Sequence, residues 1–292
     1  MTIHPWFVED RVSLAPVLGK LVMHSLHRPD IKELLIPFGA HPQQKALLLW
    51  PSQAAARRRT LIYFIHGGGW SSGGPQLFRF IGHFFVELGF PTLLGGYRLA
   101  PEYRHPAQVE DCQAGWVAGL NALARRGIAV NRLILGGQSA GAQLAALLAF
   151  DRSRWQAKGL ARGGYFSISG PISFDECVQP DLSRMIAGYI GSDDRQDWEA
   201  ANPIRFLRSD ETMPVLLIHG DSDPLVDAAN VIAFARQLVL SPACPVELDL
   251  VPGGHHADLA SIFVSDLPAR KKFENWLLTW DQPGGGTPAA SI

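Results

Sequence analysis

The segment that most constrains this chain spans residues 132–150 and reads RLILGGQSAGAQLAALLAF. A short apolar run leads into Gly137-Gln138-Ser139-Ala140-Gly141, and a run rich in alanine and leucine follows at once. A glycine at each end of the pentapeptide permits a sharp turn from a strand into a helix, which holds the serine hydroxyl at the carboxyl edge of a sheet. The helix N-terminus favours negative charge that develops beside it. A turn that only caps a helix is the alternative, but the flanking strand and helix favour a nucleophilic serine.

Short apolar segments alternate with helical patterns along most of the chain. The expected strands are residues 46–50, 61–65, 90–94, 133–135, 165–169, 215–218 and 246–251. The expected helices are residues 106–127, 140–150, 227–240 and 267–280. The strand segments are short, apolar and bounded by glycine, proline or asparagine, as buried strands of a parallel sheet are. The alternation predicts an α/β fold with a mostly parallel central sheet and helices on both faces.

The 292 residues are expected to form one such domain, residues 46–280. Residues 1–45 precede the first expected strand, and we expect them to pack over the core or over a lid. Residues 170–212 interrupt the alternation and predict a small insertion or lid near the active face. Residues 281–292 are rich in glycine and proline and predict a flexible C-terminal tail.

Composition excludes several classes of partner. The formal net charge is −1, whereas binding to nucleic acid or to an anionic membrane requires a basic surface. Three widely spaced cysteines with no CxxC pair predict free thiols in a reducing compartment. Residues 1–20 lack the pattern of a secretory signal, and no run of about 18 apolar residues occurs, so we expect a cytoplasmic protein without a membrane span.

A serine hydroxyl is a weak nucleophile at neutral pH, so it needs a base, and the base needs a carboxylate that orients it. Candidate acids follow the expected strand at 215–218: Asp221, Asp223 and Asp227. Asp223 precedes a proline, which disfavours helix and suits an acid that reaches across a loop. Asp221 and Asp227 suit a turn and a helix cap. We therefore predict Asp223 as the acid.

Two candidate bases, His255 and His256, follow the last expected strand. Neighbouring side chains point apart, so only one of the two can serve, and the residues alone do not choose between them. A metal site formed by His255, His256 and Asp258 is the alternative. Adjacent histidines rarely chelate one ion, and no further ligand cluster is evident, so neither a metal nor another cofactor is expected.

The motif His66-Gly67-Gly68-Gly69-Trp70 follows an early apolar strand segment. Attack on a carbonyl creates an oxyanion that needs N–H donors already in place, and glycines let the backbone approach a substrate closely. We predict Gly67 and Gly68, together with Ala140, as these donors, with Gly69 shaping the loop. A phosphate-binding loop would need a G-K-[ST] ending or G-x-G-x-x-G spacing, and neither is present.

The two residues that flank the three glycines have other expected roles. His66 ends the strand directly before the loop, which favours a structural hydrogen bond over a role as catalytic base. Trp70 either lines the pocket or packs beneath the loop, and both interpretations stay open.

Three motifs together resemble the hormone-sensitive-lipase-like esterases of the α/β-hydrolase superfamily: HGGGW at residues 66–70, YRLAPE at 97–102 and GQSAG at 137–141. With Asp223 and a late histidine, the resemblance covers residues 45–280. It implies an α/β-hydrolase fold with a Ser-His-Asp triad and a small lid. It also implies that the YRLAPE segment supports the active site, with Glu102 and Asp111 as network residues and not as catalysts.

The sequence departs from that group in two places. Gln138 stands where typical members carry an acidic residue before the nucleophile. Residues 165–212 and the ending His256-Ala257-Asp258-Leu259 are more similar to the arylformamidase (kynurenine formamidase) group. That similarity favours His256 over His255 as the base.

These observations predict a carboxylesterase-type serine hydrolase that cleaves small esters through Ser139, His256 and Asp223 and an acyl-enzyme. An arylformamidase that hydrolyses an N-formyl aromatic amide, such as N-formylkynurenine, is the alternative. A hydrolase-like fold that only binds a ligand is disfavoured, because such descendants usually lose a triad member. The expected partner is a small-molecule ester or amide, and an exposed edge strand or the last helix is a candidate surface for a homodimer. Acyl chain length and physiological substrate stay open.

Overall fold

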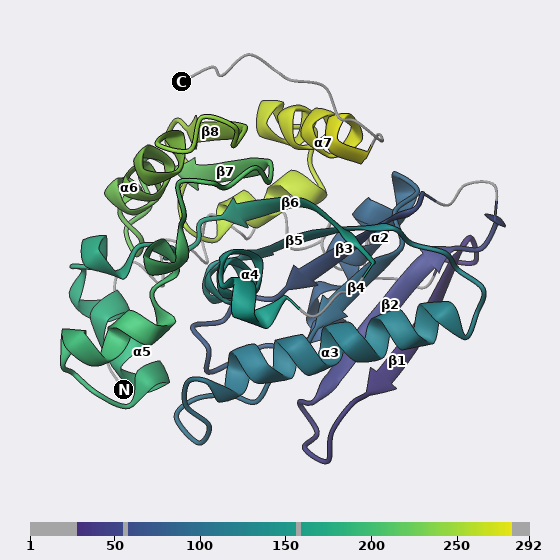
Figure 1. The fold of residues 1–292 in the computed structure, drawn as a ribbon, viewed down its shortest axis with the longest axis horizontal. Helices are drawn as coiled ribbons and strands as arrows, with labels where there is room; N and C mark the ends of the chain where they lie inside the picture. The colour runs from purple at the N-terminus through teal and green to yellow at the C-terminus, as the bar shows by residue number, and fades with distance from the viewer. Residues whose placement is uncertain (1–27, 55–57, 156–158, 282–292) are drawn as a thin grey trace.

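The computed structural model describes residues 28–54, 58–155 and 159–281, and these form one eight-stranded sheet flanked by helices (Figure 1). The strands are β1 (Ile31–Pro37), β2 (Lys45–Pro51), β3 (Thr60–Ile65), β4 (Thr92–Gly95), β5 (Arg132–Gln138), β6 (Ala161–Ile168), β7 (Val215–Gly220) and β8 (Val246–Val251). The longer helices are α2 (Arg79–Glu87), α3 (Ala107–Ala124), α4 (Ala140–Phe150), α5 (Pro180–Ile190), α6 (Ala228–Val239) and α7 (Pro268–Asp281). The short 3-10 helices are η2 (Pro75–Phe78), η3 (Arg152–Arg154), η4 (Phe174–Glu176), η5 (Arg195–Ala201), η6 (Pro203–Phe206) and η7 (Asp258–Phe263).

The strand order is β1-β2-β4-β3-β5-β6-β7-β8. Strands β1 and β2 pair antiparallel, β2 also pairs antiparallel with β4, and every pairing from β4 to β8 is parallel. The carboxyl ends of β3, β5, β7 and β8 therefore meet along one edge of the sheet, which is where ligands bind in open α/β sheets. This architecture confirms the α/β fold predicted from the sequence.

Two layers of apolar side chains sandwich the sheet, because successive residues of a strand point to opposite faces. On β3, Leu61, Tyr63 and Ile65 join a cluster with α3, α4 and α6, whereas Ile62 and Phe64 join a cluster with α2 and α7. Figure 1 shows α3 crossing in front of the sheet and α4 in front of its centre. Helix α4 is buried along its whole length, as its alanine- and leucine-rich sequence predicts. The three cysteines are free and buried.

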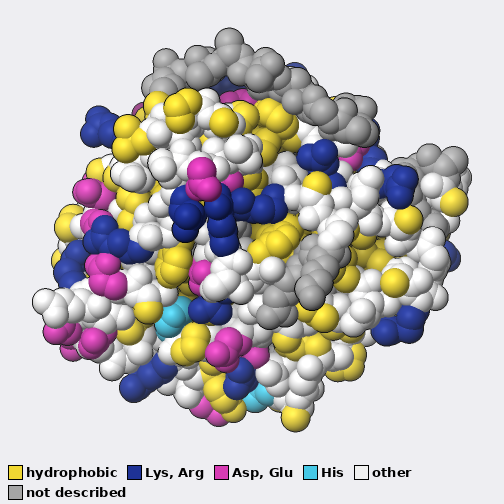
Figure 2. All heavy atoms as spheres, viewed as in Figure 1, with side chains coloured by type: hydrophobic (Ala, Val, Ile, Leu, Met, Phe, Trp, Pro, Cys, Tyr) yellow, Lys and Arg dark blue, Asp and Glu magenta, His cyan; other side chains and the backbone are white. Residues whose placement is uncertain are grey.

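The surface seen in Figure 2 carries acidic and basic side chains beside one another and not a patch of one sign. Ion pairs such as Arg152 with Asp210, at 2.9 Å between Nη1 and Oδ2, pair opposite charges on the exposed surface. None of the helices in the described ranges combines the length and the apolar character needed to cross a membrane.

The structure corrects the expected boundary at residue 46. Residues 31–37 were expected in an extension outside the sheet, but they form β1, which pairs with β2 along its whole length. Lys32 and Glu33 interrupt the apolar run of β1, because an edge strand leaves part of its surface in water. Residues 1–27 and the expected tail at 282–292 lie outside the described residues. The sequence also gave no prediction of α2 or of α5, the latter within residues 170–212.

Candidate active site

Ser139 occupies the sharp turn between β5 and α4. Its backbone has φ 52° and ψ −127°, a strained conformation for a residue with a side chain. Its N–H donates to the carbonyl of Ile168 at the end of the neighbouring strand β6, at 2.9 Å. A Cβ at Gly141 would overlap the carbonyl oxygens of Ile65 and His66, so only glycine lets α4 approach β3 this closely. The turn therefore holds the serine hydroxyl at the carboxyl edge of the sheet.

His256 and Asp223 lie beside this hydroxyl, as predicted. The Nε2 atom of His256 is 2.9 Å from Ser139 Oγ, and its Nδ1 atom is 2.8 Å from Asp223 Oδ2. An ionised carboxylate can only accept, so Nδ1 carries the proton and Nε2 is left to accept from the serine hydroxyl. All three side chains are largely buried, which strengthens each of these hydrogen bonds.

The other oxygen of Asp223 fixes the carboxylate in place. Oδ1 accepts from the backbone N–H groups of Leu225 and Val226, both at 2.9 Å. Burial raises the pKa of the Asp223 carboxyl, but the facing imidazole of His256 and these hydrogen bonds lower it, and the pKa lies below its ordinary range. Asp223 is therefore ionised at neutral pH.

The competing acids and the competing histidine have other partners. Asp221 Oδ1 accepts from the N–H of Gly253 at 2.7 Å, and Asp227 Oδ1 accepts from the N–H of Ala229 as the N-cap of α6. These are the turn and cap roles expected for them. The backbone N–H of His255 donates to Asp258 Oδ1 at 2.9 Å. Within the described ranges, no group of three or more His, Cys, Asp or Glu residues could hold a metal ion.

The glycine loop lies directly against Ser139. A Cβ at Gly67 would be 2.9 Å from the carbonyl oxygen of Gln138 and 3.3 Å from Ser139 Cβ. Gly68 has φ 118°, and its carbonyl oxygen accepts from the N–H groups of Ser71 and Ser72, which closes a tight turn. Among the described residues, no hydrogen bond uses the N–H of Gly67 or Gly68. The N–H of Ala140, the first residue of α4, has no acceptor within its own helix. These three donors are thus free for a ligand.

His66 takes no part in the triad. It is buried and stacks on Tyr97, with the ring centroids 4.3 Å apart, and the Tyr97 hydroxyl donates to the His66 carbonyl at 3.1 Å. Burial lowers the pKa of His66 to about 4, so the ring is neutral at pH 7. This placement agrees with the structural role predicted for it.

The depressed pKa of His66 predicts acid sensitivity of the fold. Below pH 6.5 the unfolded chain protonates this histidine while the folded chain does not, so the free energy of unfolding falls with pH until about pH 4. The loss from this residue is on the order of 2–3 kcal/mol. Urea unfolding at pH 7, 5.5 and 4.5 measures it, and the His66→Gln variant should show a shallower pH slope. An equal slope in both proteins would contradict the assignment.

The YRLAPE segment contacts the glycine loop through a backbone hydrogen bond. The N–H of Ala100 donates to the carbonyl of Trp70 at 2.9 Å. Arg98 binds the carboxylate of Asp111 through two hydrogen bonds of 2.8 and 2.9 Å, and Gln44 donates to the same group at 2.8 Å. Asp111 is thus the network residue that was expected. Glu102, which was expected in the same network, is exposed and joins none of these hydrogen bonds.

One residue beside the candidate triad, His219, was not predicted from the sequence. His219, the penultimate residue of β7, is fully buried, and its Nε2 lies 2.8 Å from the Val226 carbonyl and 3.5 Å from Asp223 Oδ2. Burial lowers its pKa, so it presents a neutral ring to the carboxylate. The available signal in the sequence was its position at the end of a strand, directly before the turn that contains Asp223. Trp70 is buried, which decides between the two interpretations in favour of packing beneath the loop.

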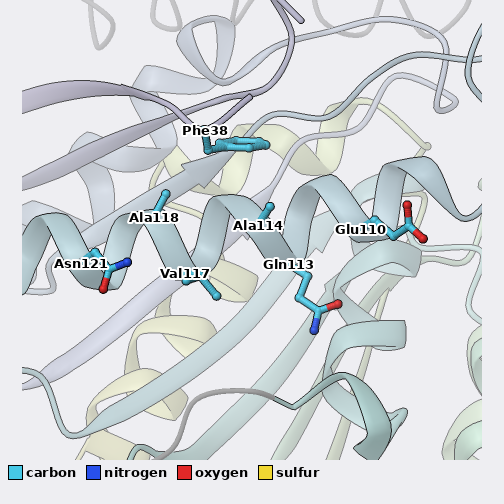
Figure 3. Close-up of a pocket in the computed structure, with 7 residues that line it drawn as sticks. All are labelled: Phe38, Glu110, Gln113, Ala114, Val117, Ala118 and Asn121. Carbon is cyan, nitrogen blue, oxygen red and sulfur yellow. The ribbon is translucent and has the colours of Figure 1, made fainter. Parts of the chain in front are cut away.

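A hollow of the surface lies away from this edge of the sheet. Figure 3 shows it along the exposed side of α3, opposite Phe38. Its other lining residues are Glu110, Gln113, Ala114, Val117, Ala118 and Asn121. Its lining contains neither histidine nor serine, so it cannot hold a serine–histidine pair, and the edge of the sheet with Ser139, His256 and Asp223 remains the candidate active site.

Comparisons with known proteins agree with this fold. A family model described as "alpha/beta hydrolase fold" matches residues 62–259, which include the glycine loop and the triad. Esterase LipQ of Mycobacterium tuberculosis is 28% identical over 251 residues, which are 80% of this chain and 59% of LipQ. The ethyl acetate hydrolase of Pseudomonas putida is 25% identical over 221 residues, which are 70% of this chain and 68% of that protein. This chain thus spans less than two thirds of LipQ.

A solved hormone-sensitive lipase from a metagenome library superposes with a TM-score of 0.68 at 20% identity, covering 97% of this chain and 93% of that one. At this identity the likeness speaks for the fold alone. The family match extends over more than half of the 292 residues, with an eight-stranded, mostly parallel sheet beneath it. The hormone-sensitive lipase of Homo sapiens is 33% identical over 131 residues, which are 44% of this chain and 12% of that protein, and this match confirms the predicted resemblance to the hormone-sensitive-lipase-like esterases. The chain therefore belongs to the α/β-hydrolase family.

Proposed function

We propose that this protein is a serine hydrolase that cleaves small carboxylic esters. The observation that carries the proposal is the chain of two hydrogen bonds, 2.9 Å from Ser139 Oγ to His256 Nε2 and 2.8 Å from His256 Nδ1 to Asp223 Oδ2. A serine within hydrogen-bond reach of a base that is itself oriented by a carboxylate is the arrangement that nucleophilic catalysis requires.

The first half-reaction forms an acyl-enzyme. Ser139 Oγ attacks the ester carbonyl carbon while His256 Nε2 takes its proton, and the ionised Asp223 stabilises the imidazolium. The carbonyl oxygen becomes an oxyanion that accepts from the N–H groups of Gly67, Gly68 and Ala140. His256 then gives its proton to the leaving alcohol as the carbon–oxygen bond breaks.

The second half-reaction releases the acid. A water molecule gives a proton to His256 and attacks the acyl carbon, a second oxyanion forms in the same site, and Ser139 leaves with the proton from His256. The alcohol leaves with the proton that Ser139 gave up, and the water molecule supplies the proton that Ser139 regains, so Ser139 and His256 end in their starting protonation states. The names of the matched relatives, an esterase and an ethyl acetate hydrolase, support a small ester as the substrate.

Labelling with a fluorophosphonate probe tests the proposal. We expect one adduct, mapped to Ser139 by mass spectrometry, and loss of ester hydrolysis in step with labelling. An unlabelled, inactive protein would overturn the proposal and favour a fold that only binds a ligand.

The choice of substrate class is tested separately. We expect p-nitrophenyl acetate to be hydrolysed with a higher kcat/KM than N-formylkynurenine. A clear preference for the formamide would replace the esterase proposal with arylformamidase activity of the same triad.

A further inference from the structure

Trp70 ends the glycine loop, and contacts with two other residues fix its side chain beneath the loop. The indole Nε1 donates to Gln143 Oε1 at 2.9 Å, and the ring stacks on Tyr189 with centroids 4.6 Å apart and planes 8° apart. Only 1% of the residue is exposed. Trp70 also has φ 58°, an unfavourable conformation for a bulky side chain that persists only where surrounding contacts enforce it.

The two partners of Trp70 come from elements that frame the nucleophile. Gln143 lies in the first turn and a half of α4, the helix that begins directly after Ser139. Its amide Nε2 donates to the carbonyl of Ala201 at 2.6 Å, which ties the same side chain to residues 170–212. Tyr189 belongs to α5 in that region, and its hydroxyl is 2.9 Å from His105 Nδ1. Trp70 therefore connects the glycine loop to the helix of the nucleophile and to the insertion.

Backbone hydrogen bonds hold the loop from within and from the YRLAPE segment: the Gly68 carbonyl accepts from the N–H groups of Ser71 and Ser72, and the Trp70 carbonyl accepts from the N–H of Ala100. The side chain of Trp70 adds the contact with α4, which these bonds do not supply. Gly68, Gly69 and Trp70 have φ values of 118°, 58° and 58°, three successive residues outside the ordinary regions. The side chain of Met185 from α5 covers Gly69, so that a Cβ there would overlap its methyl group. The orientation of the Gly67 and Gly68 N–H groups thus depends on how the loop is held at its end.

We infer that Trp70 is a positioning residue for the oxyanion site, acting through the hydrogen bond from its Nε1 to Gln143. This inference rests on the proposed function. The bond sets the distance between the glycine loop and α4, and hence the distance from the Gly67 and Gly68 donors to the carbonyl that Ser139 attacks. A hydrogen-bond donor displaced from a developing oxyanion loses most of its effect on the transition state and little of its effect on substrate binding.

The Trp70→Phe variant tests this inference because it keeps an aromatic ring on Tyr189 while it removes the indole donor and part of the buried volume, a volume loss that the control variant shares. Trp116→Phe is the matched control: Trp116 is also 1% exposed, but its Nε1 has no hydrogen-bond partner among the described residues. For Trp70→Phe we expect kcat on p-nitrophenyl acetate to fall about tenfold with KM within about twofold, since one buried hydrogen bond is lost. Trp116→Phe should keep kcat within about twofold.

Two further measurements separate positioning from a general loss of structure. A trifluoromethyl ketone forms an adduct with Ser139 that carries an oxyanion, so its Ki should rise in Trp70→Phe by the same factor as kcat/KM falls. Hydrogen exchange of the peptide that contains residues 66–70 should accelerate in Trp70→Phe and not in Trp116→Phe. The kinetic and exchange measurements on both variants and the wild type are made without urea, under conditions in which the three proteins are folded to the same fraction.

The outcomes are distinct. An active wild type whose Trp70→Phe variant keeps kcat, or whose loop exchange does not change, overturns this inference and leaves the proposed function intact. Equal losses of kcat in the Trp70 and Trp116 variants overturn it as well, because the effect would then be one of packing. A wild-type protein that neither hydrolyses esters nor reacts with the ketone overturns the proposed function, and the inference with it.

Discussion

Replacing Ser139 with alanine is expected to lower kcat for p-nitrophenyl acetate by about 10⁴-fold or more, with the protein still folded. The reason is that Oγ is the only atom removed, and it is the atom that His256 Nε2 contacts at 2.9 Å. The backbone hydrogen bond from Ser139 to Ile168 is kept. Steady-state kinetics and urea unfolding of the same preparation measure the two quantities.

Ser169 offers a matched control for this substitution. It follows β6 as Ser139 follows β5, it has φ 49°, and it is fully buried. Its Oγ has no hydrogen-bond partner among the described residues. Ser169→Ala should therefore change kcat by no more than about twofold. Comparable losses in the two variants, or retained turnover in Ser139→Ala, would remove Ser139 from the mechanism.

Asp223→Asn is expected to lower kcat by about 10³- to 10⁴-fold, an effect larger than the loss of one hydrogen bond. The N–H groups of Leu225 and Val226 require an acceptor at the Oδ1 position, so the new amide must turn its NH₂ group toward His256. That group donates to Nδ1, which places the imidazole proton on Nε2. The base then faces Ser139 with a proton already in place and cannot take another.

Asp227→Asn is the control, because Asp227 caps α6 and contacts neither the triad nor the glycine loop. Asparagine is about as good an N-cap as aspartate, so both kcat and the free energy of unfolding should stay close to wild type. The pH–rate profile distinguishes the mechanism further: activity of Asp223→Asn should rise at high pH, where hydroxide replaces the lost base. A profile identical in shape to wild type would argue against the tautomer explanation.

Local sequence was sufficient to predict the turn that holds Ser139, because a strand, a glycine-flanked serine and a helix are contiguous and need no tertiary information. The acid was predictable for a similar reason, since Asp223 precedes a proline while its neighbours suit a turn and a cap. The choice of His256 over His255 needed a family resemblance, because the rotation of two adjacent side chains depends on strand β8 and the turn after it.

Other features could not be predicted because their causes lie far apart in the chain. Trp70 and Gln143 are 73 positions apart, and only the packing of α4 against the glycine loop brings them together. In the sequence, His219 is one more residue of a buried strand, and only the folded structure shows that it lies beside Asp223. Strand β1 was missed because its charged residues break the apolar pattern, and only pairing with β2 reveals it as an edge of the sheet.

The positive φ angle of Ser139 implies that the side chain needed for the proposed reaction lowers the free energy of unfolding at this residue. Trp70, Ser139 and Ser169 are the three non-glycine residues with positive φ in the described chain, and they follow β3, β5 and β6, which are neighbours in the sheet. Glycine would occupy such a backbone without strain, so Ser139→Gly should raise the free energy of unfolding by up to about 1 kcal/mol, measured by urea unfolding, while abolishing turnover. A fall in that free energy would contradict the strain. If the proposed function holds, selection for stability alone would favour glycine at position 139 and so an inactive protein, and a variant that is both stable and active must gain its stability at other residues.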